Sequence, residues 1–181
     1  MKGIIFTEFL ELVEDKFGLD ITDQMLEMCQ DQGIYTAVGS YDHIDLVKLI
    51  VALSKLTGIS AEDLQQVYGR TVFNTLLESL PPHASLNRCE TTFQFIQHVE
   101  HYIHVEVKKL YPDAQPPQFK FLSVNETEML MDYTSARCLS HVCFGLIQGC
   151  ADHYQQQVEI AMTPQDQNGS HVQFKLSLVQ Q

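Results

Sequence analysis

The sequence predicts an α+β fold, in which a helical N-terminal part packs on a four-stranded antiparallel sheet with one inserted helix. Two observations carry this prediction. Apolar residues recur at helical spacing through roughly the first two thirds of the chain and later alternate with a period of two. The alternating segments also form two pairs, each joined by a short turn as in β-hairpins. A length of 181 residues suffices for one sizeable core and favours a single domain.

The N-terminal part is predicted to begin with three helices. The first follows from apolar residues spaced three or four apart, namely Phe6, Phe9, Leu10, Val13 and Phe17. Gly18 ends this segment, and Asp20 or Thr22 is expected to cap a short helix that reaches Cys29. Residues 45–56 (DLVKLIVALSKL) are apolar almost all round, so they predict a well-buried helix.

Two longer helices are predicted next. Ser60 is typical of a helix N-cap because acidic residues follow it in the first turn. The apolar pattern continues to Leu80, where Pro81-Pro82 ends the helix. Gly69 falls inside this helix, where glycine costs about 1 kcal/mol relative to alanine. Either another element packs closely there or the helix bends. A further long amphipathic helix is predicted over Phe93–Leu110.

The remaining chain predicts the sheet and the inserted helix. The four alternating segments are residues 119–124, 129–133, 158–162 and 172–178. Asn125-Glu126 is expected to join the first two strands, and Asn168-Gly169 the last two. Between these hairpins, residues Leu139–Tyr154 return to helical spacing and predict the inserted helix.

Composition narrows the function classes. Eleven basic and 23 acidic residues give a net charge of −12, which argues against a nucleic-acid or acidic-membrane partner. The N-terminus is interrupted by acidic residues, unlike a signal peptide, and no run approaches the ~18 apolar residues of a membrane span. Five cysteines, an odd number without an export signal, favour reduced thiols and a cytoplasmic location.

Tyr133, Ser135 and Arg137 alternate along a predicted strand, so they are expected to share one face of it. Two hydroxyls and a guanidinium together suit an oxyanion, since arginine offers a charged fork and the hydroxyls bind the remaining lone pairs. A solvated strand face or local ion pairs would give the same pattern. The residues alone therefore leave the anion open.

The helix over residues 93–110 carries His98, His101 and His104. His104 lies at the edge of the apolar stripe with Glu100 one turn away, so it is a core histidine, an exposed one or a metal ligand. The Glu-x-x-His pairs of a di-iron site are missing. Cys138, His141 and Cys143 form another cluster, but these three do not share one helix face, which argues against zinc. No nucleophile, P-loop or dinucleotide motif argues for catalysis.

Tyr133-x-Ser135-x-Arg137, downstream of a helical histidine and a Pro-Pro pair, resembles the heme nitric oxide/oxygen binding (H-NOX) family. These bacterial sensor domains are related to the heme domain of soluble guanylate cyclase. The likeness covers essentially the whole chain. Its matching blocks are MKGII at the start, VYGR at 67–70, His104 followed by Pro116-Pro117, YTSAR at 133–137 and FGLIQG at 144–149.

The resemblance implies a single heme-binding sensor domain over residues 1–181. A helical subdomain would span about residues 1–62, and the heme-binding helices and sheet would span about residues 63–181, with heme b between the two parts. Tyr133, Ser135 and Arg137 would clamp the heme propionates. His104 would coordinate the iron as its axial ligand.

The same resemblance gives roles to apolar residues. Ile5 and Pro117 would press on the porphyrin, and the distal side would be lined by Phe9, Phe73, Val142 and Leu146. Ordinary core packing accounts equally well for such residues, because a heme pocket is mostly an apolar wall. His98 and His101 have no counterpart in the family and are expected at the surface. The final hairpin contains no cysteine, so the structural zinc site of some relatives is not expected.

Val142 indicates which gas is bound. Oxygen-binding members carry a distal tyrosine at the position that aligns with Val142, which has no hydrogen-bond donor. The resemblance therefore implies a nitric oxide sensor, with carbon monoxide as a further ligand, and not an enzyme. Nitric oxide would break the bond between His104 and iron, and the N-terminal helices would shift, with Gly69 as a flexing point.

A separate partner protein is expected, because the sequence reaches Gln181 without an output domain. The family implies a histidine kinase, in two-component signalling, as the first candidate and a cyclic-di-GMP enzyme as the second.

Three alternative functions stay open. They are a heme protein that binds oxygen or carbon monoxide, a metal-free module that binds a small anion, and an enzyme with a metal held by His98, His101 or the pair Cys138 and His141.

Overall fold

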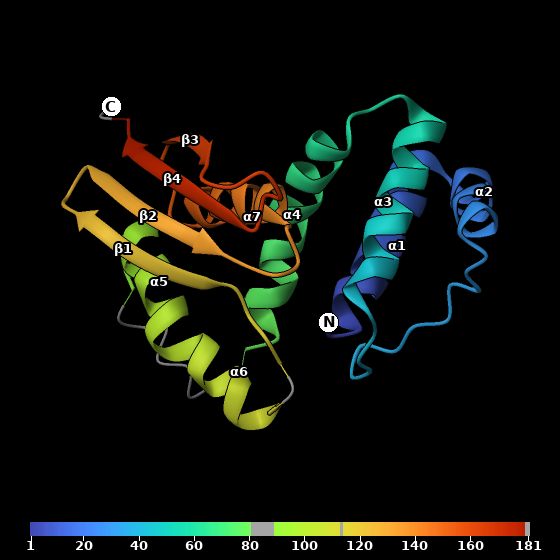
Figure 1. The fold of residues 1–181 in the computed structure, drawn as a ribbon, viewed down its shortest axis with the longest axis horizontal. Coiled ribbons are helices and arrows are strands. Elements are labelled where there is room, and N and C mark those ends of the chain that lie inside the picture. Colours follow the sequence, from blue (N-terminus) through green and yellow to red (C-terminus); the bar gives the residue numbers. More distant parts are fainter. Residues whose placement is uncertain (81–88, 113, 180–181) are drawn as a thin grey trace.

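The computed structural model describes residues 1–80, 89–112 and 114–179. Helices build the N-terminal part, and four antiparallel strands with a helix between the two hairpins build the C-terminal part. The predicted α+β fold is therefore confirmed. Figure 1 shows α1–α3 together at one end of the molecule, the sheet at the other end, and α4 and α7 between them.

The first three helices are α1 (Ile4–Phe17), α2 (Leu19–Cys29) and α3 (His43–Thr57). Gly18 separates α1 from α2 with φ +83°, a conformation that glycine adopts without strain, so α2 begins at the next residue. Asp20 and Thr22 consequently lie inside α2, and the prediction that one of them caps it is wrong. The Thr22 hydroxyl instead donates to the Gly18 carbonyl at 3.1 Å.

Helix α4 (Ala61–Glu78) connects the two parts of the molecule. The Ser60 hydroxyl accepts a hydrogen bond from the Asp63 amide at 3.0 Å, which confirms the predicted N-cap. The helix passes Gly69 without a break. Pro81-Pro82, predicted to end it, lie outside the described residues.

Glycines let α4 and α7 (Ser140–His153) approach each other at backbone distance. A Cβ atom at Gly69 would lie 2.2 Å from the Val142 carbonyl oxygen, and one at Gly145 would lie 2.0 Å from that of Gln66. Close packing therefore explains the glycine within α4, and this was one of the two predicted alternatives. A role of Gly69 as a flexing point stays a prediction.

Replacing Gly145 with alanine should lower the free energy of unfolding by about 2–3 kcal/mol, because its methyl group would meet backbone atoms of α4 that cannot turn aside. Urea titration followed by circular dichroism measures the loss. Asn74→Ala changes an exposed residue of α4 and should shift the free energy by no more than about 0.5 kcal/mol. Equal stability of the two variants would contradict the close approach.

The helix predicted over Phe93–Leu110 is interrupted in the structure. It consists of α5 (Thr92–His98), a π-helical turn over Val99–Ile103, and α6 (His104–Leu110). The His104 amide donates to the Val99 carbonyl, five residues earlier, which closes the π turn. The prediction of regular α-helical spacing is therefore wrong in the middle of this segment. π turns are rare and are frequent at functional sites.

The sheet has the strand order β1-β2-β4-β3, in which every neighbouring pair is antiparallel. Its strands are β1 (Gln118–Val124), β2 (Glu128–Thr134), β3 (Val158–Pro164) and β4 (His171–Leu178). The register of β1 and β2 shifts between Phe121 and Ser123. Phe119 of β1 lies opposite Tyr133 of β2, so the start of β1 is paired with the end of β2.

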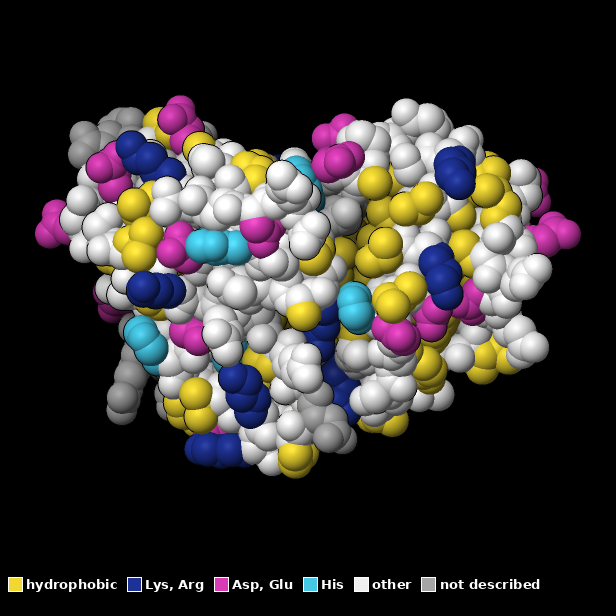
Figure 2. Space-filling view, viewed as in Figure 1, with side chains coloured by type: hydrophobic (Ala, Val, Ile, Leu, Met, Phe, Trp, Pro, Cys, Tyr) yellow, Lys and Arg dark blue, Asp and Glu magenta, His cyan; other side chains and the backbone are white. Residues whose placement is uncertain are grey.

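Apolar residues pack in separate clusters on either side of α4 and α7. Phe6, Phe9 and Leu49 belong to the N-terminal cluster, and Met131 and Phe174 belong to the cluster under the sheet. Figure 2 shows further hydrophobic side chains gathered on the surface of the half that α1–α3 form. In the described part of the chain, no helix is both long and apolar enough to cross a membrane. The division near residue 62 stays a prediction.

Candidate functional site

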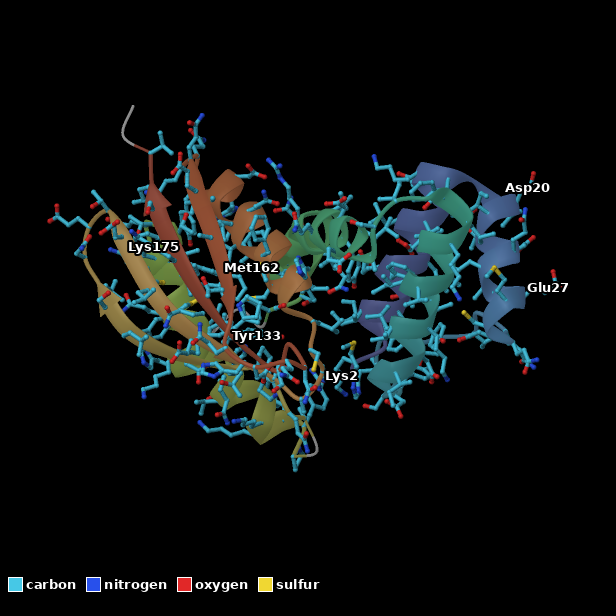
Figure 3. All side chains as sticks on the ribbon, turned by 45° about the horizontal axis from the view of Figure 1, so that its top comes forward. Lys2, Asp20, Glu27, Tyr133, Met162 and Lys175 are labelled. Atoms are coloured by element: carbon cyan, nitrogen blue, oxygen red, sulfur yellow. The ribbon has the colours of Figure 1, made fainter. Side chains whose placement is uncertain are left out.

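Tyr133, Ser135 and Arg137 lie where β2 ends. Tyr133 is 3% exposed and belongs to the strand, but β2 ends at Thr134. Ser135 and Arg137 therefore lie in the following turn, and the prediction that one strand face carries all three is wrong. The Ser135 amide donates to the Ser170 carbonyl at 2.8 Å, which fixes where the turn leaves the sheet. Figure 3 shows Tyr133 at the end of the sheet that lies toward Lys2.

The turn nevertheless brings the three side chains together. The Ser135 hydroxyl accepts from the Arg137 amide at 3.2 Å and lies beside the Tyr133 side chain. Burial raises the pKa of Tyr133 well above its ordinary value, so its hydroxyl stays protonated and can donate. A buried phenol, a buried hydroxyl and a guanidinium are thus neighbours. The sequence predicted this grouping from alternation along a strand, whereas the structure achieves it through a turn.

The Arg137 guanidinium is half-buried without a carboxylate partner. Among the described residues, no acidic side chain lies within the 4.0 Å of an ion pair with it. Burial lowers the pKa of Arg137, opposed by the Tyr133 hydroxyl nearby. A buried charge without a partner is costly, so this site favours an anion that the chain itself does not supply.

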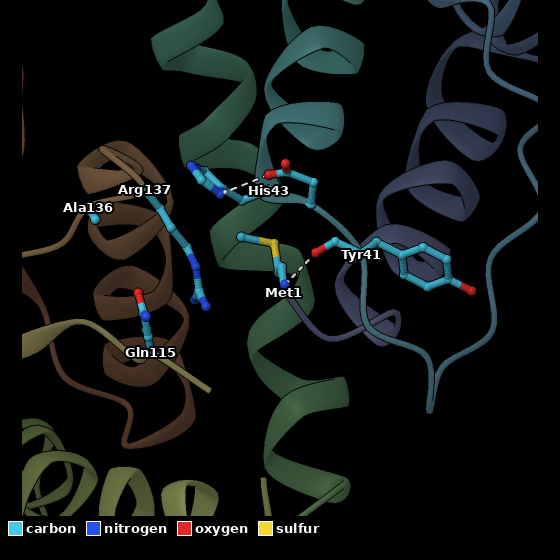
Figure 4. A pocket seen from close by; sticks show the side chains of 7 residues that line it. Met1, Tyr41, His43, Gln115, Ala136 and Arg137 are labelled. Carbon is cyan, nitrogen blue, oxygen red and sulfur yellow. Dashed lines mark hydrogen bonds and ion pairs between the residues drawn. The ribbon is translucent and has the colours of Figure 1, made fainter. Parts of the chain in front are cut away.

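Two clefts meet at Arg137. The first, of about 220 Å³, is lined by Met1, Tyr41, Asp42, His43, Gln115, Ala136 and Arg137. Figure 4 shows the Arg137 side chain reaching into this cleft between Ala136 and Met1. The second, of about 310 Å³, is lined by Lys108, Ala114, Gln115, Pro116, Gln118, Thr134, Ser135, Ala136 and Arg137. The guanidinium therefore lines both clefts.

His104 begins α6, directly after the π turn, and its side chain is 14% exposed. Its Nδ1 lies 2.9 Å from Glu100 Oε2, and the same oxygen accepts from the Phe119 amide at 3.1 Å. Burial lowers the pKa of His104, and the Glu100 carboxylate opposes this shift. A neutral imidazole bonded at Nδ1 keeps the lone pair of Nε2, which is the form that coordinates a metal.

The apolar residues predicted to line the pocket lie around α1, α4 and α7. Ile5, Phe9, Val142 and Leu146 belong to one cluster, in which Phe9 is 1% exposed. Phe73 lies in the adjoining cluster, where it also meets Leu146. These five side chains form a continuous apolar region. Pro117 is half-buried just before β1, and no contact in the structure assigns it to this region.

Two residues at the site received no role from the sequence. Glu100 carries the bonds to His104 and Phe119, and its only signal was a spacing of four residues from His104. Tyr68, within the VYGR block, is 1% exposed and donates to the Ile5 carbonyl at 2.6 Å. It also meets Phe9 edge-on, with ring centroids 5.4 Å apart. Tyr68 therefore fixes the start of α1 against α4, and with it the position of Ile5.

Replacing Tyr68 with phenylalanine should lower the free energy of unfolding by about 1 kcal/mol, because it removes one buried hydrogen bond while keeping the ring. Urea titration measures the change. Tyr111→Phe is the matched control, since Tyr111 is 43% exposed and its ring, not its hydroxyl, lies under Lys2 Nζ. A loss as small as that of the control would show that the bond to Ile5 does not hold α1 in place.

The other histidines and cysteines are not arranged as a metal centre. In the part of the chain that the structure describes, no group of three or more His, Cys, Asp or Glu side chains can hold a metal ion. His98 is half-buried and stacks on Tyr102, so its expected place at the surface is only partly right, whereas His101 is exposed. His141 Nδ1 lies 3.1 Å from Gln66 Nε2.

Comparisons with known proteins agree with this geometry. A model of the haem-NO-binding family matches residues 2–162. The H-NOX protein of K. algicida, solved in the unliganded Fe(II) state, is 33% identical with a TM-score of 0.92, covering 100% of this chain and 98% of that one. The Shewanella woodyi H-NOX, bound to IWP-051 in the Fe(II)CO state, is 36% identical with a TM-score of 0.80, covering 98% and 94%.

The S. oneidensis H-NOX in the Fe(II)NO state has the same fold, with a TM-score of 0.87 at 23% identity over 99% of this chain and 100% of that one. A search of curated proteins found no match. Together, the fold and the family match define a heme-based gas sensor domain. The chain belongs to the haem-NO-binding family, the H-NOX proteins.

Proposed function

We propose that the chain senses nitric oxide with a ferrous heme b whose axial ligand is His104. The observation that carries this proposal is the partly buried His104 imidazole, which is bonded to Glu100 through Nδ1 and so offers the lone pair of Nε2. The relatives from K. algicida and S. woodyi, each more than 30% identical, support an Fe(II) heme.

The residues described above fit the group. Arg137, unpaired and lining both clefts, would bind the propionates, helped by the hydroxyls of Tyr133 and Ser135. Ile5, Phe9, Phe73, Val142 and Leu146 would form the apolar wall, and Pro117 would press on the ring together with Ile5. Ferrous heme supplies an iron atom at which a diatomic gas binds.

The selectivity for nitric oxide rests on Val142. This side chain is half-buried on α7, packs against the N-terminal cluster and has no hydrogen-bond donor. A wall without a donor gives no stabilisation to polarised dioxygen, whereas nitric oxide and carbon monoxide do not depend on it. Tyr68 is a buried tyrosine of the same cluster, but its hydroxyl already donates to the Ile5 carbonyl. The lack of a donor therefore favours a nitric oxide sensor over a heme protein that binds oxygen.

The signal would begin with His104. When nitric oxide binds, His104 would be released from the iron, α6 would shift, and the N-terminal helices would move against the sheet-bearing half. Lys2 Nζ lies 3.3 Å from the centre of the Tyr111 ring, so the N-terminal segment touches the chain just after α6. The gas acts by favouring one of two packings of the same elements.

The output would pass to a separate protein in the cytoplasm. A histidine kinase in a two-component system is the first candidate and a cyclic-di-GMP enzyme the second, and both rest on the family alone. We propose that the domain itself is a sensor module and not an enzyme, as its family implies. The competing hypothesis is a metal-free module that binds a small carboxylate at Arg137, and it is favoured by the same unpaired guanidinium.

One experiment separates these functions. The protein is purified without oxygen, heme and iron are measured per chain, and the reduced form is exposed separately to nitric oxide, carbon monoxide and air. We expect a single heme per chain, absorption shifts with nitric oxide and carbon monoxide, and no stable complex in air. A stable oxygen complex would overturn the assignment from Val142. A protein that stays colourless even after reconstitution with heme would overturn the heme-sensor proposal and support the anion-binding module instead.

A further inference from the structure

The Glu100 carboxylate joins the proposed iron ligand to the sheet. Its Oε2 atom lies 2.9 Å from His104 Nδ1 and accepts from the Phe119 amide at 3.1 Å. The side chains of Glu100 and His104 are 23% and 14% exposed, so water competes only weakly for these bonds. Phe119 is the second residue of β1, which means that a strand and not another helix fixes the carboxylate.

These bonds set the tautomer of His104. A carboxylate only accepts hydrogen bonds, so His104 Nδ1 must carry the proton that it shares with Glu100. In the neutral ring the lone pair is then on Nε2. The Phe119 side chain meets the same imidazole, with ring centroids 5.4 Å apart, and limits its rotation. Strand β1 thus orients His104 through two contacts. The Phe119 amide holds Glu100, which bonds to His104, and the Phe119 ring packs against the imidazole directly.

The π turn places this carboxylate. Glu100 lies inside the turn of Val99–Ile103, and His104 closes it through its amide. An isolated π turn is less stable than an α-helical one, so contacts from outside the helix must favour it. The bond from the Phe119 amide to Glu100 is such a contact. The ligand, its hydrogen-bond partner and the irregular turn therefore form one unit that is anchored on β1.

We propose that Glu100 is a positioning residue that holds His104 in the Nδ1–H form and sets the strength of its bond to iron. A carboxylate on the far nitrogen raises the electron donation of the coordinating nitrogen. Glu100 therefore opposes the release of His104 and determines how readily the sensor responds. This inference rests on the proposed role of His104 as axial ligand.

The test compares three variants of the heme-loaded protein. Glu100→Gln keeps the shape and an accepting oxygen but removes the charge, and Glu100→Ala removes both. Glu106→Gln is the matched control, because Glu106 lies in α6 with His104 and pairs with Lys109 at 2.7 Å instead of with His104. The readouts are the iron–histidine stretching frequency in resonance Raman spectra of the reduced protein, the midpoint potential, and heme affinity.

We expect Glu100→Gln to lower the stretching frequency and raise the midpoint potential, and Glu100→Ala to extend both shifts. Heme affinity should fall by about 10- to 100-fold in Glu100→Ala, the effect typical of losing an outer-shell partner. Glu106→Gln should match the wild-type protein. A frequency and potential unchanged in both Glu100 variants would overturn the inference while leaving His104 as the ligand. If the wild-type protein has no iron–histidine band, the role of His104 fails as well.

Discussion

Replacing His104 with glycine should abolish the iron–histidine band of the reduced protein and weaken heme binding by more than about 100-fold, the upper effect of losing only an outer-shell partner. The His104 imidazole at the start of α6 is 14% exposed, and because its Nδ1 is bonded to Glu100, the lone pair of Nε2 is available. Added imidazole should restore the band, because glycine leaves room for a free ligand. Resonance Raman spectroscopy and heme titration measure both effects.

His101→Ala is the control for this prediction. His101 lies in the π turn, is exposed, and meets Phe121 at a ring-centroid distance of 5.7 Å. Its replacement should leave the band in place. The contradicting result is that His104→Gly keeps the iron–histidine band while His101→Ala or a substitution of His98 removes it. That result would show that another histidine of this segment binds the iron. It would also overturn the proposal that Glu100 positions the iron ligand.

Replacing Arg137 with methionine should have opposite effects on heme binding and on the stability of the heme-free protein. A hydrogen-bonded charge contributes about 1.5–3 kcal/mol, so heme affinity should fall by roughly 10- to 150-fold. In the heme-free protein the half-buried guanidinium lacks an acidic partner among the described residues, and its removal should leave the urea midpoint unchanged or higher. Heme-transfer rates measure the change in heme affinity, and urea titration measures the change in the stability of the heme-free protein.

Arg70→Met is the control for charge. Arg70 is about half exposed and forms a two-pronged ion pair with Asp152, at 2.6 and 2.9 Å, between α4 and α7. Exposed pairs contribute little, so this variant should lose less than about 1 kcal/mol of stability and no heme affinity. If Arg137→Met lowers the stability of the heme-free protein instead, the guanidinium has a partner in the chain and is not kept for an external anion.

Much of the fold was predictable because its signals are local. The period of the apolar residues gave the helices and strands, and Ser60 gave the start of α4 through its hydroxyl. The exceptions have non-local causes. The positive φ of Gly18 starts α2 earlier than a side-chain cap would, and the π turn before His104 is favoured by a bond from β1, nineteen residues downstream of Glu100. No pattern within one segment reveals such a bond.

The grouping of Tyr133, Ser135 and Arg137 was predictable from the sequence, but its geometry was not. Tyr133, Ser135 and Arg137 do meet, but through a turn that is fixed by Ser170, so strand alternation gave the right neighbours for the wrong reason. Tyr68 reaches across 63 residues to the Ile5 carbonyl. A hydrogen bond over that separation depends on how α1 and α4 pack against each other. That packing cannot be predicted from the sequence of either helix alone.

The structure also connects the two ends of the proposed heme site. His104 meets Phe119, and the Phe119 ring lies 6.1 Å from that of Tyr133 on the paired strand. Glu100 holds the Phe119 amide from the other side. The proposed axial ligand and the proposed propionate clamp are therefore joined by one strand pair, and the start of β1 is in direct contact with His104.

The proposed switch requires that nitric oxide separates His104 from the iron of a bound heme. The most direct test is the electron paramagnetic resonance spectrum of the reduced, heme-loaded protein after nitric oxide is added without oxygen, with the absorption spectrum recorded alongside. We expect hyperfine splitting from the nitric oxide nitrogen alone, because His104 would have left the iron. Additional splitting from an imidazole nitrogen at saturating nitric oxide would show that the bond survives, and would contradict the proposed switch.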